Sequence, residues 1–261
     1  MELIKPTRKL GNAAGVLLPK ELANSLVKIE IIDYLLDEID LMKLLREYID
    51  LNEIIGVYLV GGYARGDYDN DSDVDVLVIS GNVDLEINKD KYQITIIPKE
   101  VLDQQKGYPL YYHMINEAKP VLNEYLLNSY RKDLKLSING IKEYIKATKK
   151  MIKKAESHVR SKNSKNGRTD DAVAYSLILR LRGLYLLDCV DDRKKSSKNG
   201  LLSLIKSLTS SLDMYDRYNA IKNNKKLKED SIEIGDAQKV IDYLKEGLEK
   251  WEEIIKEEGR F

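Results

Sequence analysis

The stretch GGYARGDYDNDSDVDVLVI, residues 61–79, decides which fold and chemistry we expect. It places two glycines before a turn rich in Asp and Asn, and an apolar strand-like run follows. Side chains two residues apart in a strand share a face, so Asp73 and Asp75 are expected to project together, opposite Val74 and Val76. Two carboxylates on one face repel each other unless a cation lies between them, and Mg²⁺ or Mn²⁺ prefers such oxygen ligands. The stretch therefore predicts a divalent metal site.

The glycine pair Gly61 and Gly62 comes where one strand ends and a helix is expected to begin. Residues without a side chain let backbone N–H groups approach a phosphate closely, and the helix dipole favours negative charge there. Arg65 would add a fixed cation for the same phosphate. The alternative interpretation is structural: a strand end whose acids are solvated after a tight turn.

Two strings in order, Gly61-Gly62-Tyr63-Ala64-Arg65-Gly66 and Ser72-Asp73-Val74-Asp75-Val76, resemble the nucleotidyltransferase superfamily of DNA polymerase β type. The likeness is to its small members and to kanamycin nucleotidyltransferase-like proteins. It implies that Asp73 and Asp75 are catalytic and hold the metals, and that Gly61, Gly62 and Ser72 contact the nucleotide phosphates. The implied reaction moves a nucleoside monophosphate from a nucleoside triphosphate to an acceptor hydroxyl on a protein, an RNA or a small molecule, and pyrophosphate leaves.

One position departs from the pattern of that superfamily. A third carboxylate normally lies on the next strand, which here reads YQITIIP and has Gln93 or Thr95 at the expected places. Glu86 or Asp90, in the preceding connection, would replace it only if the chain folded them inward, and we expect both at the surface. Because the third acid helps to hold the metal that activates the acceptor hydroxyl, its loss affects rate more than nucleotide binding. Two interpretations therefore stay open: a slow enzyme, and a protein that only binds nucleotide.

The first 32 residues form a separate pattern of short β-type runs and turns. The strings Arg8-Lys9-Leu10-Gly11-Asn12 and Gly15-Val16-Leu17-Leu18-Pro19-Lys20-Glu21-Leu22 resemble the swapped-hairpin DNA-binding domains of the AbrB, SpoVT and MazE group. This resemblance implies a homodimer with interlocked hairpins, in which Lys5, Arg8 and Lys9 face DNA. The alternative is a hairpin that only dimerises or caps its neighbours and carries ordinary surface lysines.

We therefore expect an α+β protein of three parts: a small β-hairpin unit over 1–32, a mixed-sheet nucleotidyltransferase domain over 33–128, and a helical bundle over 129–261. In the middle part, the runs IIGVYLV, DVDVLVI and YQITIIP predict three strands, and PVLNE predicts an edge strand. Four amphipathic runs separated by polar loops predict an up-and-down bundle. The bundle loosely resembles the HEPN bundles that accompany minimal nucleotidyltransferases.

Few residues of the helical part suggest chemistry of their own. His158 follows lysines where HEPN ribonucleases carry an arginine, so we expect a solvated histidine and no ribonuclease site. Arg180 and Arg182 lie within an apolar helix and need partners, either a structural ion pair or a phosphate or acidic acceptor in a cleft. Tyrosines such as Tyr111, Tyr112, Tyr175 and Tyr185 could stack on a base, but most should fill the core, because the chain has 17 Tyr and one Phe.

Composition limits the remaining possibilities. The 261 residues carry 43 basic and 43 acidic side chains, so no net charge draws the chain to nucleic acid or membrane, and any such contact must be local. No apolar run has the length of a membrane span and the start lacks a signal peptide, so we expect a cytoplasmic protein. One cysteine and two histidines leave almost no material for thiolate, zinc or serine-triad chemistry. Carboxylates must therefore carry any catalysis.

Two functions from other classes compete with transfer. One is a dimeric, antitoxin-like DNA-binding regulator, in which residues 1–32 bind an operator and the transferase fold only binds nucleotide. The other is an interaction scaffold without either activity, for which nucleotide and Mg²⁺ would leave thermal stability unchanged.

Overall fold

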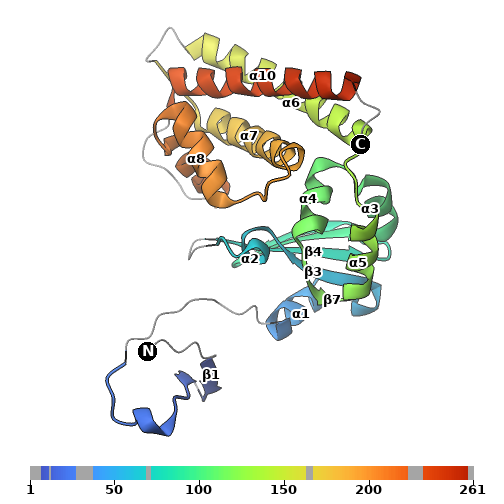
Figure 1. The fold of residues 1–261 in the computed structure, drawn as a ribbon, viewed down its shortest axis with the longest axis vertical. Coiled ribbons are helices and arrows are strands. Elements are labelled where there is room, and N and C mark those ends of the chain that lie inside the picture. The colour runs from blue at the N-terminus through green and yellow to red at the C-terminus, as the bar shows by residue number, and fades with distance from the viewer. Residues whose placement is uncertain are drawn as a thin grey trace. The chain divides into compact units, whose positions relative to one another are not determined.

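The structure is a computed structural model that describes residues 7–11, 13–27, 38–68, 72–162, 167–222 and 232–257. It divides into two compact units, Met1–Met42 and Lys43–Phe261, which are treated separately (Figure 1). Helix α1, Glu38–Arg46, spans the boundary between them, and the short 3₁₀ helix η2, Leu51–Glu53, follows it.

The first unit is a small β-hairpin. Strands β1 (Thr7–Leu10) and β2 (Ala13–Val16) pair antiparallel, and Gly11 takes the positive φ of +61° that the turn requires. A 3₁₀ helix, η1 (Lys20–Leu22), follows and buries none of its residues. Of the basic residues expected to face DNA, Lys5 lies outside the described residues, and Arg8 and Lys9 are placed in β1 by their backbone alone. DNA binding and dimerisation stay predictions.

The second unit contains a five-stranded mixed sheet in the order β5-β6-β4-β3-β7. Strands β4 and β6 are parallel, and the other neighbouring pairs are antiparallel. Three strands and the edge strand were expected at these places, and the structure has them. The bounds are β3 Ile54–Val60, β4 Val74–Ser80, β5 Leu85–Lys89, β6 Tyr92–Pro98 and β7 Lys119–Leu122.

Strand β5 corrects the sequence interpretation, which took residues 81–91 as a turn-rich connection. Leu85–Lys89 pair antiparallel with β6 through a turn at Asp90, whose φ is +54°. Only Ile87 of this strand is buried, so the sequence lacks the repeated alternation of apolar and polar residues that would have predicted a strand. Glu86 and Asp90 are exposed, as expected.

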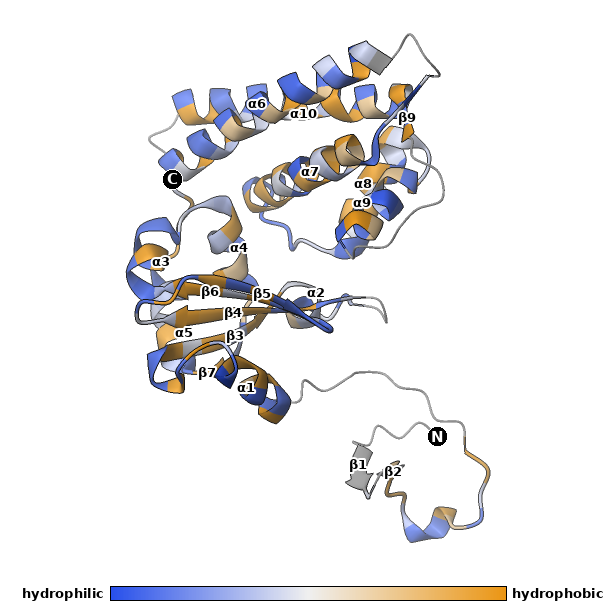
Figure 2. Cartoon of the chain, turned by 180° about the vertical axis from the view of Figure 1, so that it is seen from behind, coloured by the Kyte–Doolittle hydropathy of each residue, from blue (hydrophilic) through white to orange (hydrophobic). Residues whose placement is uncertain are grey.

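Three helices pack with the sheet around one hydrophobic core: α3 (Lys99–Gln105), α4 (Pro109–Glu117) and α5 (Glu124–Lys132) (Figure 1). Strand β4 is coloured almost entirely as hydrophobic in Figure 2, and it lies in the middle of the sheet. A short helix, α2 (Gly61–Arg65), joins β3 to the loop before β4. The buried core residues are Tyr58, Val60, Leu77, Ile79, Ile97, Leu102, Ile115, Ala118, Leu127 and Tyr130.

The second half of this unit is helical, as predicted. Helix α7 is buried along most of its length, and its neighbours include α6, α9 and α10. Trp251 of α10 is fully buried, and its indole N–H donates to Asp188 of α7 at 2.9 Å. The bounds are α6 Ile138–Lys162, β8 Arg168–Thr169, α7 Asp171–Asp191, α8 Lys198–Thr209, α9 Asp213–Lys222, β9 Ile232–Glu233 and α10 Ile234–Glu257.

The expected third helix of the bundle, residues 200–221, is in fact two helices. Ser210 ends α8 in the left-handed conformation with a φ of +61°, and its N–H bonds to the carbonyl of Lys206. Asp213 then starts α9, and its N–H donates to the hydroxyl of Ser211 at 3.3 Å. Serine competes with the helix for backbone hydrogen bonds, so this Ser-Ser pair was the available signal. No described helix is long and apolar enough to cross a membrane.

Candidate functional site

The turn after β3 depends on glycine at one position. Gly61 has a φ of +68°, and a Cβ placed there would lie 2.2 Å from Oδ2 of Asp75. No other residue fits without moving the carboxylate or straining the backbone. At Gly62 the nearest atom to such a Cβ is 3.5 Å away, which is ordinary contact. Gly61 therefore lets the turn close onto Asp75, while Gly62 faces a cavity.

Asp73 and Asp75 lie at the start of β4 and line the same cavity. Asp75 pairs in register with Val60 of β3 on one side and with Gln93 of β6 on the other. Asp73 directly precedes the strand, and its Oδ2 lies 2.9 Å from Nζ of Lys222, at the end of α9. One acid is thus held by a lysine from the bundle, and the other faces the space between the sheet and the bundle.

The charge of Asp75 is incompletely compensated. Burial raises the pKa of its carboxyl, and the charges of Lys222 and Arg182 lower it only in part, because Asp73 and Glu117 add negative charge. No described residue forms a hydrogen bond or an ion pair with this carboxylate. A partly buried carboxylate without a partner is costly, so this position favours a bound cation.

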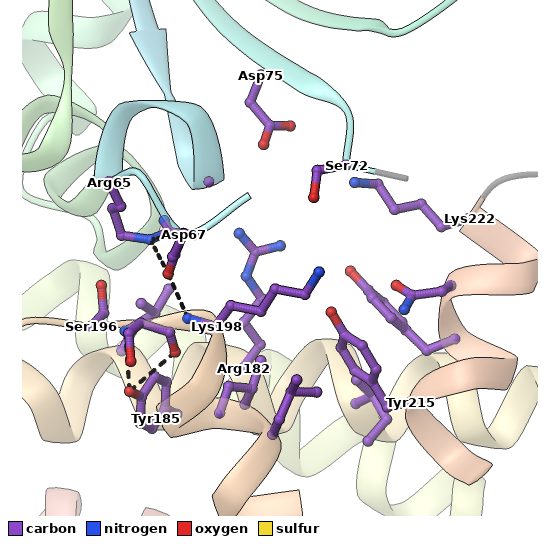
Figure 3. Close-up of a pocket in the computed structure, with 18 of the residues that line it drawn as sticks. Arg65, Asp67, Ser72, Asp75, Arg182, Tyr185, Ser196, Lys198, Tyr215 and Lys222 are labelled. Carbon is purple, nitrogen blue, oxygen red and sulfur yellow. Dashed lines mark hydrogen bonds and ion pairs between the residues drawn. The ribbon is translucent and has the colours of Figure 1, made fainter. Parts of the chain in front are cut away.

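The cavity has a volume of about 500 Å³ and is walled by the sheet part on one side and the helical part on the other (Figure 3). Besides Arg65, its wall contains three cationic residues, Arg182, Lys198 and Lys222. Figure 3 shows Asp75 and Ser72 across the cavity from Arg182, Lys198 and Tyr215. A space of this size suits a nucleotide-sized ligand.

Arg65 is engaged by two carboxylates. Its Nη1 donates to Oε2 of Glu117 at 2.7 Å, and its Nε donates to Asp67 at 3.2 Å. The other oxygen of Glu117 accepts the backbone N–H of Gly61 at 2.8 Å. Both residues were expected to contact phosphate, but these donors are directed to protein carboxylates, and of the two only Arg65 lines the cavity. Gly62 and Ser72 line the cavity as well.

A second link joins the sheet part to the bundle. Oδ2 of Asp67 accepts the backbone N–H of Lys198 at 2.6 Å, at the start of α8. Ser197 caps the same helix, since its hydroxyl accepts the N–H of Gly200 at 3.0 Å, and the N–H of Ser197 donates to the hydroxyl of Tyr185 at 3.2 Å. These bonds fix the start of α8 beside the cavity, where Lys198 reaches into it (Figure 3).

The position of the third carboxylate is occupied by an amide. Gln93 lies directly beside Asp75 in the parallel pair of β4 and β6, and neither Glu86 nor Asp90 lines the cavity. Two acids from helices line it instead: Glu117 of α4, which is bonded to Arg65, and Asp216 of α9 at the rim. Burial and the charge of Asp213 raise the pKa of Asp216.

Several cavity residues carried little or no sequence signal. Arg182 is the exception, because an arginine in an apolar helix is conspicuous in the sequence. It faces the cavity without an ion pair to any described residue. Lys198 and Lys222 look like ordinary surface lysines in the sequence, and only the fold brings them to the site. Hydrogen bonding to Asp73 and the charge of Asp75 raise the pKa of Lys222, although burial opposes this.

The tyrosines divide between core and cavity. Tyr111 packs with the sheet core, and Tyr112 and Tyr175 pack with the bundle core, as expected for most of them. Tyr185 packs with the bundle and also lines the cavity. His158 is half exposed and pairs with Asp170 at 2.6 Å, away from the cavity.

The oxygen donors at the cavity fit a hard divalent cation. Asp73 and Asp75 provide two carboxylates on one strand end, and the hydroxyl of Ser72 lies beside them in the wall. Within the described ranges, no group of three or more His, Cys, Asp or Glu residues forms a metal cluster. Two carboxylates are nevertheless enough for Mg²⁺, which commonly completes its shell with water and substrate phosphates.

Comparisons with known proteins agree with the resemblance at the glycine pair and the two aspartates. Residues 41–159, a little under half of the chain, match the family model described as a nucleotidyltransferase domain. The residues before and after this range are not part of the match, so the resemblances to AbrB-type hairpins and to HEPN bundles stay predictions. No curated protein matches the chain significantly.

Two solved structures are similar to the chain. One is a nucleotidyltransferase-like protein from Exiguobacterium sibiricum 255-15, with 14% identity, a TM-score of 0.34, and coverage of 82% of this chain and 74% of that one. The other is the spectinomycin adenyltransferase AAD(9) from Enterococcus faecialis, solved with ATP and spectinomycin, with 17% identity, a TM-score of 0.41, and coverage of 81% and 98%. At these values neither structure indicates a substrate for this chain.

Proposed function

We propose that the protein is a metal-dependent nucleotidyltransferase that moves a nucleoside monophosphate from a nucleoside triphosphate to an acceptor hydroxyl. The observation that carries this proposal is the carboxylate of Asp75, which lacks a partner among the described residues and lies beside Asp73 in the cavity. The match of residues 41–159 to nucleotidyltransferase domains supports the same chemistry.

The cavity has the charges that a triphosphate needs. Arg182, Lys198 and Lys222 supply positive charge from three helices of the bundle, opposite the strand end with Asp73 and Asp75. Gly62 and Ser72 offer a close approach and a hydroxyl on the sheet side. Because cations fixed in advance need no reorganisation, they can stabilise the negative charge that develops on the phosphates during transfer.

Asp73 and Asp75 would hold Mg²⁺ or Mn²⁺, which would bind the phosphate oxygens, neutralise their charge and make the acceptor hydroxyl more acidic. Lys222 now pairs with Asp73, so it already balances part of the charge that a cation would meet there. Gly61 keeps Asp75 in place, because only a residue without a Cβ fits against its Oδ2.

The reaction forms one bond and breaks one. The acceptor oxygen attacks the α-phosphorus, the bond between that phosphorus and the bridging oxygen breaks, and pyrophosphate leaves with the electron pair. The hydroxyl proton passes to a base or to water. Since Gln93 cannot act as the base and Glu117 is bonded to Arg65 and Gly61, we expect a slow enzyme unless Asp216 or solvent accepts the proton.

Labelled nucleoside triphosphates test this proposal directly. The protein is incubated with each triphosphate labelled on the α-phosphate, with Mg²⁺ or Mn²⁺ and candidate acceptors. Asp73→Asn and Asp75→Asn should each lower label transfer by at least ~100-fold, because each removes a charged ligand. Asp84→Asn is the matched control, since Asp84 is exposed and lies outside the cavity. Transfer that survives both cavity substitutions would refute the mechanism.

A second candidate function follows from the separate hairpin unit. If β1 and β2 pair with a second copy, Lys5, Arg8 and Lys9 would place basic charge on a dimeric hairpin, and the second unit would only sense nucleotide. Salt-dependent DNA binding that is lost when residues 1–32 are removed, together with no label transfer, favours this regulator. The oligomeric state of the full chain in solution tests the homodimer.

A further inference from the structure

A histidine in the cavity wall has an unused hydrogen-bonding atom. The side chain of His113, on α4, is only 7% exposed, and its Nε2 is buried without a hydrogen-bond partner. The same residue lines the cavity. Buried polar atoms are almost always hydrogen-bonded, so an orphaned one at a cavity indicates a partner that arrives with a ligand.

His113 is neutral, which determines what Nε2 can do. Burial lowers its pKa to about 4, helped by the charges of Arg182 and Arg65, and a backbone hydrogen bond with Leu186 opposes this only partly. A neutral imidazole has one donor nitrogen and one acceptor nitrogen. Because the bond with the Leu186 backbone uses the other nitrogen as donor, Nε2 is left as an acceptor. The missing partner must therefore donate an N–H or O–H.

The cavity wall around His113 is mostly apolar. Leu110 and Met114 flank it on the same face of α4, and Ile178 and Leu186 face it from α7, which packs against α4. Leu110 is 62% exposed, so this end of the cavity is open to solvent. Apolar walls with a single acceptor suit a planar ring that carries one donor group.

The position next to Arg182 indicates which part of a nucleotide would lie here. The charge of Arg182 acts on His113 and on Asp75 alike, so its guanidinium lies near both. A triphosphate held by Arg182 and Lys198, opposite Asp75 and the metal that Asp75 would hold, would leave the rest of the nucleotide to extend along the wall. The apolar wall with His113 adjoins the phosphate site on the side of α4.

We propose that this end of the cavity binds the nucleobase, and that Nε2 of His113 accepts a hydrogen bond from the exocyclic amino group of adenine or cytosine. The proposal rests on the proposed function, because it presupposes a triphosphate at Asp73 and Asp75. It adds a choice of base, which the exocyclic amino group of adenine or cytosine would set. Leu110, Met114 and Leu186, which are at least partly exposed, contact the faces of the ring.

Equilibrium binding separates this proposal from transfer. The full chain is titrated calorimetrically in the presence of Mg²⁺ and without an acceptor. Two pairs of ligands are compared: ATP and purine riboside triphosphate, and CTP and its analogue that lacks the 4-amino group. One amino-bearing nucleotide should bind about tenfold more tightly than its analogue, because a site built for a donor rejects a ligand without one. The two pairs tell adenine from cytosine.

Variants then assign the preference to one atom. His113→Phe should remove most of that tenfold difference and leave the affinity for the deamino analogue within about threefold, whereas His113→Gln should keep part of it, because its amide oxygen still accepts. His158→Phe is the matched control, since His158 lies outside the cavity. Thermal unfolding confirms that each variant is folded.

Three results overturn the proposal. These are equal binding of both members of both pairs, an unchanged ratio in His113→Phe, and a ratio lost equally in His158→Phe. Tight binding of all triphosphates without base preference refutes the base site alone and leaves the transferase standing. Absence of binding by any triphosphate refutes both.

Discussion

The carboxylate of Asp67 accepts the backbone N–H of Lys198 at 2.6 Å, across 131 residues of chain. This bond continues a series that starts at the glycine turn: Gly61 donates to Glu117, which accepts from Arg65, which donates to Asp67. Apart from Gly61, each member lines the cavity. The turn that holds Asp75 is therefore connected through charged hydrogen bonds to the start of α8 and to Lys198.

Breaking this series at Asp67 should affect nucleotide affinity and stability together. Asp67→Ala removes the acceptor for α8 and one partner of Arg65, and charge-assisted hydrogen bonds of this kind contribute about 2 kcal/mol each to the free energy of unfolding. Because two such bonds are removed, we expect a loss of up to about 4 kcal/mol in urea denaturation. We also expect a KM for the triphosphate raised by about five- to tenfold, with kcat less changed, because Lys198 is no longer held at the cavity.

Asp67→Asn is the informative partner of that variant. Its amide oxygen can still accept the N–H of Lys198 but carries no charge for Arg65, so its KM should lie between those of the wild type and Asp67→Ala. Asp84→Ala, an exposed acid outside the cavity, should leave both quantities unchanged. A KM that stays constant in Asp67→Ala while stability falls would make the link purely structural.

The two adjacent glycines of the turn should respond differently to the same substitution. Gly61→Ala places a Cβ 2.2 Å from Oδ2 of Asp75 at a φ of +68°, so it should cost about 2 kcal/mol in backbone strain and displace the carboxylate. Label transfer should fall by ~100-fold or more. Gly62→Ala meets nothing closer than 3.5 Å and should change the free energy of unfolding by less than ~1 kcal/mol. Equal effects in denaturation and transfer assays would contradict this account of the turn.

The glycine pair and the aspartates were visible in the sequence because their chemistry is local: a strand end, a turn and two carboxylates at a spacing of two. Glu117, Lys198 and Lys222 were not, since each is an ordinary charged residue until the fold brings it to the cavity. The same limit applies to β5, which has one buried residue and takes its identity from pairing with β6.

Arg182 is intermediate between the residues that the sequence identified and those that only the fold brings to the cavity. An arginine within an apolar helix signals that a partner is needed, but the sequence left open whether this is an ion pair within the protein or a ligand in a cleft. The structure shows no such pair with the described residues and directs Arg182 to the cavity. Local sequence identified the unusual residue, and only the packing of α7 against α4 identified what it faces.

The break between α8 and α9 gives a prediction on stability alone. Ser210 is held at a φ of +61°, where a residue with a Cβ is strained, so Ser210→Gly should raise the free energy of unfolding by about 1 kcal/mol. Ser207→Gly, at an exposed position inside α8, should instead lower it by about 0.5 kcal/mol. Urea denaturation of both variants checks the pair, and the same sign for both would show that Ser210 does not end the helix.

The buried His113 should make stability depend on pH in a defined window. Its pKa is lowered by burial to about 4 in the folded chain, against 6.5 for the ordinary group. Between these values the unfolded chain binds a proton that the folded chain does not. The contribution of His113 to the free energy of unfolding is therefore fully present above pH 6.5 and is lost as the pH falls towards 4. The difference amounts to about 3 kcal/mol. His113→Phe should therefore lose less stability than the wild type between pH 7 and pH 4.5 in urea denaturation. If His113→Phe kept the wild-type dependence on pH, His113 would not be the group that binds the proton on unfolding.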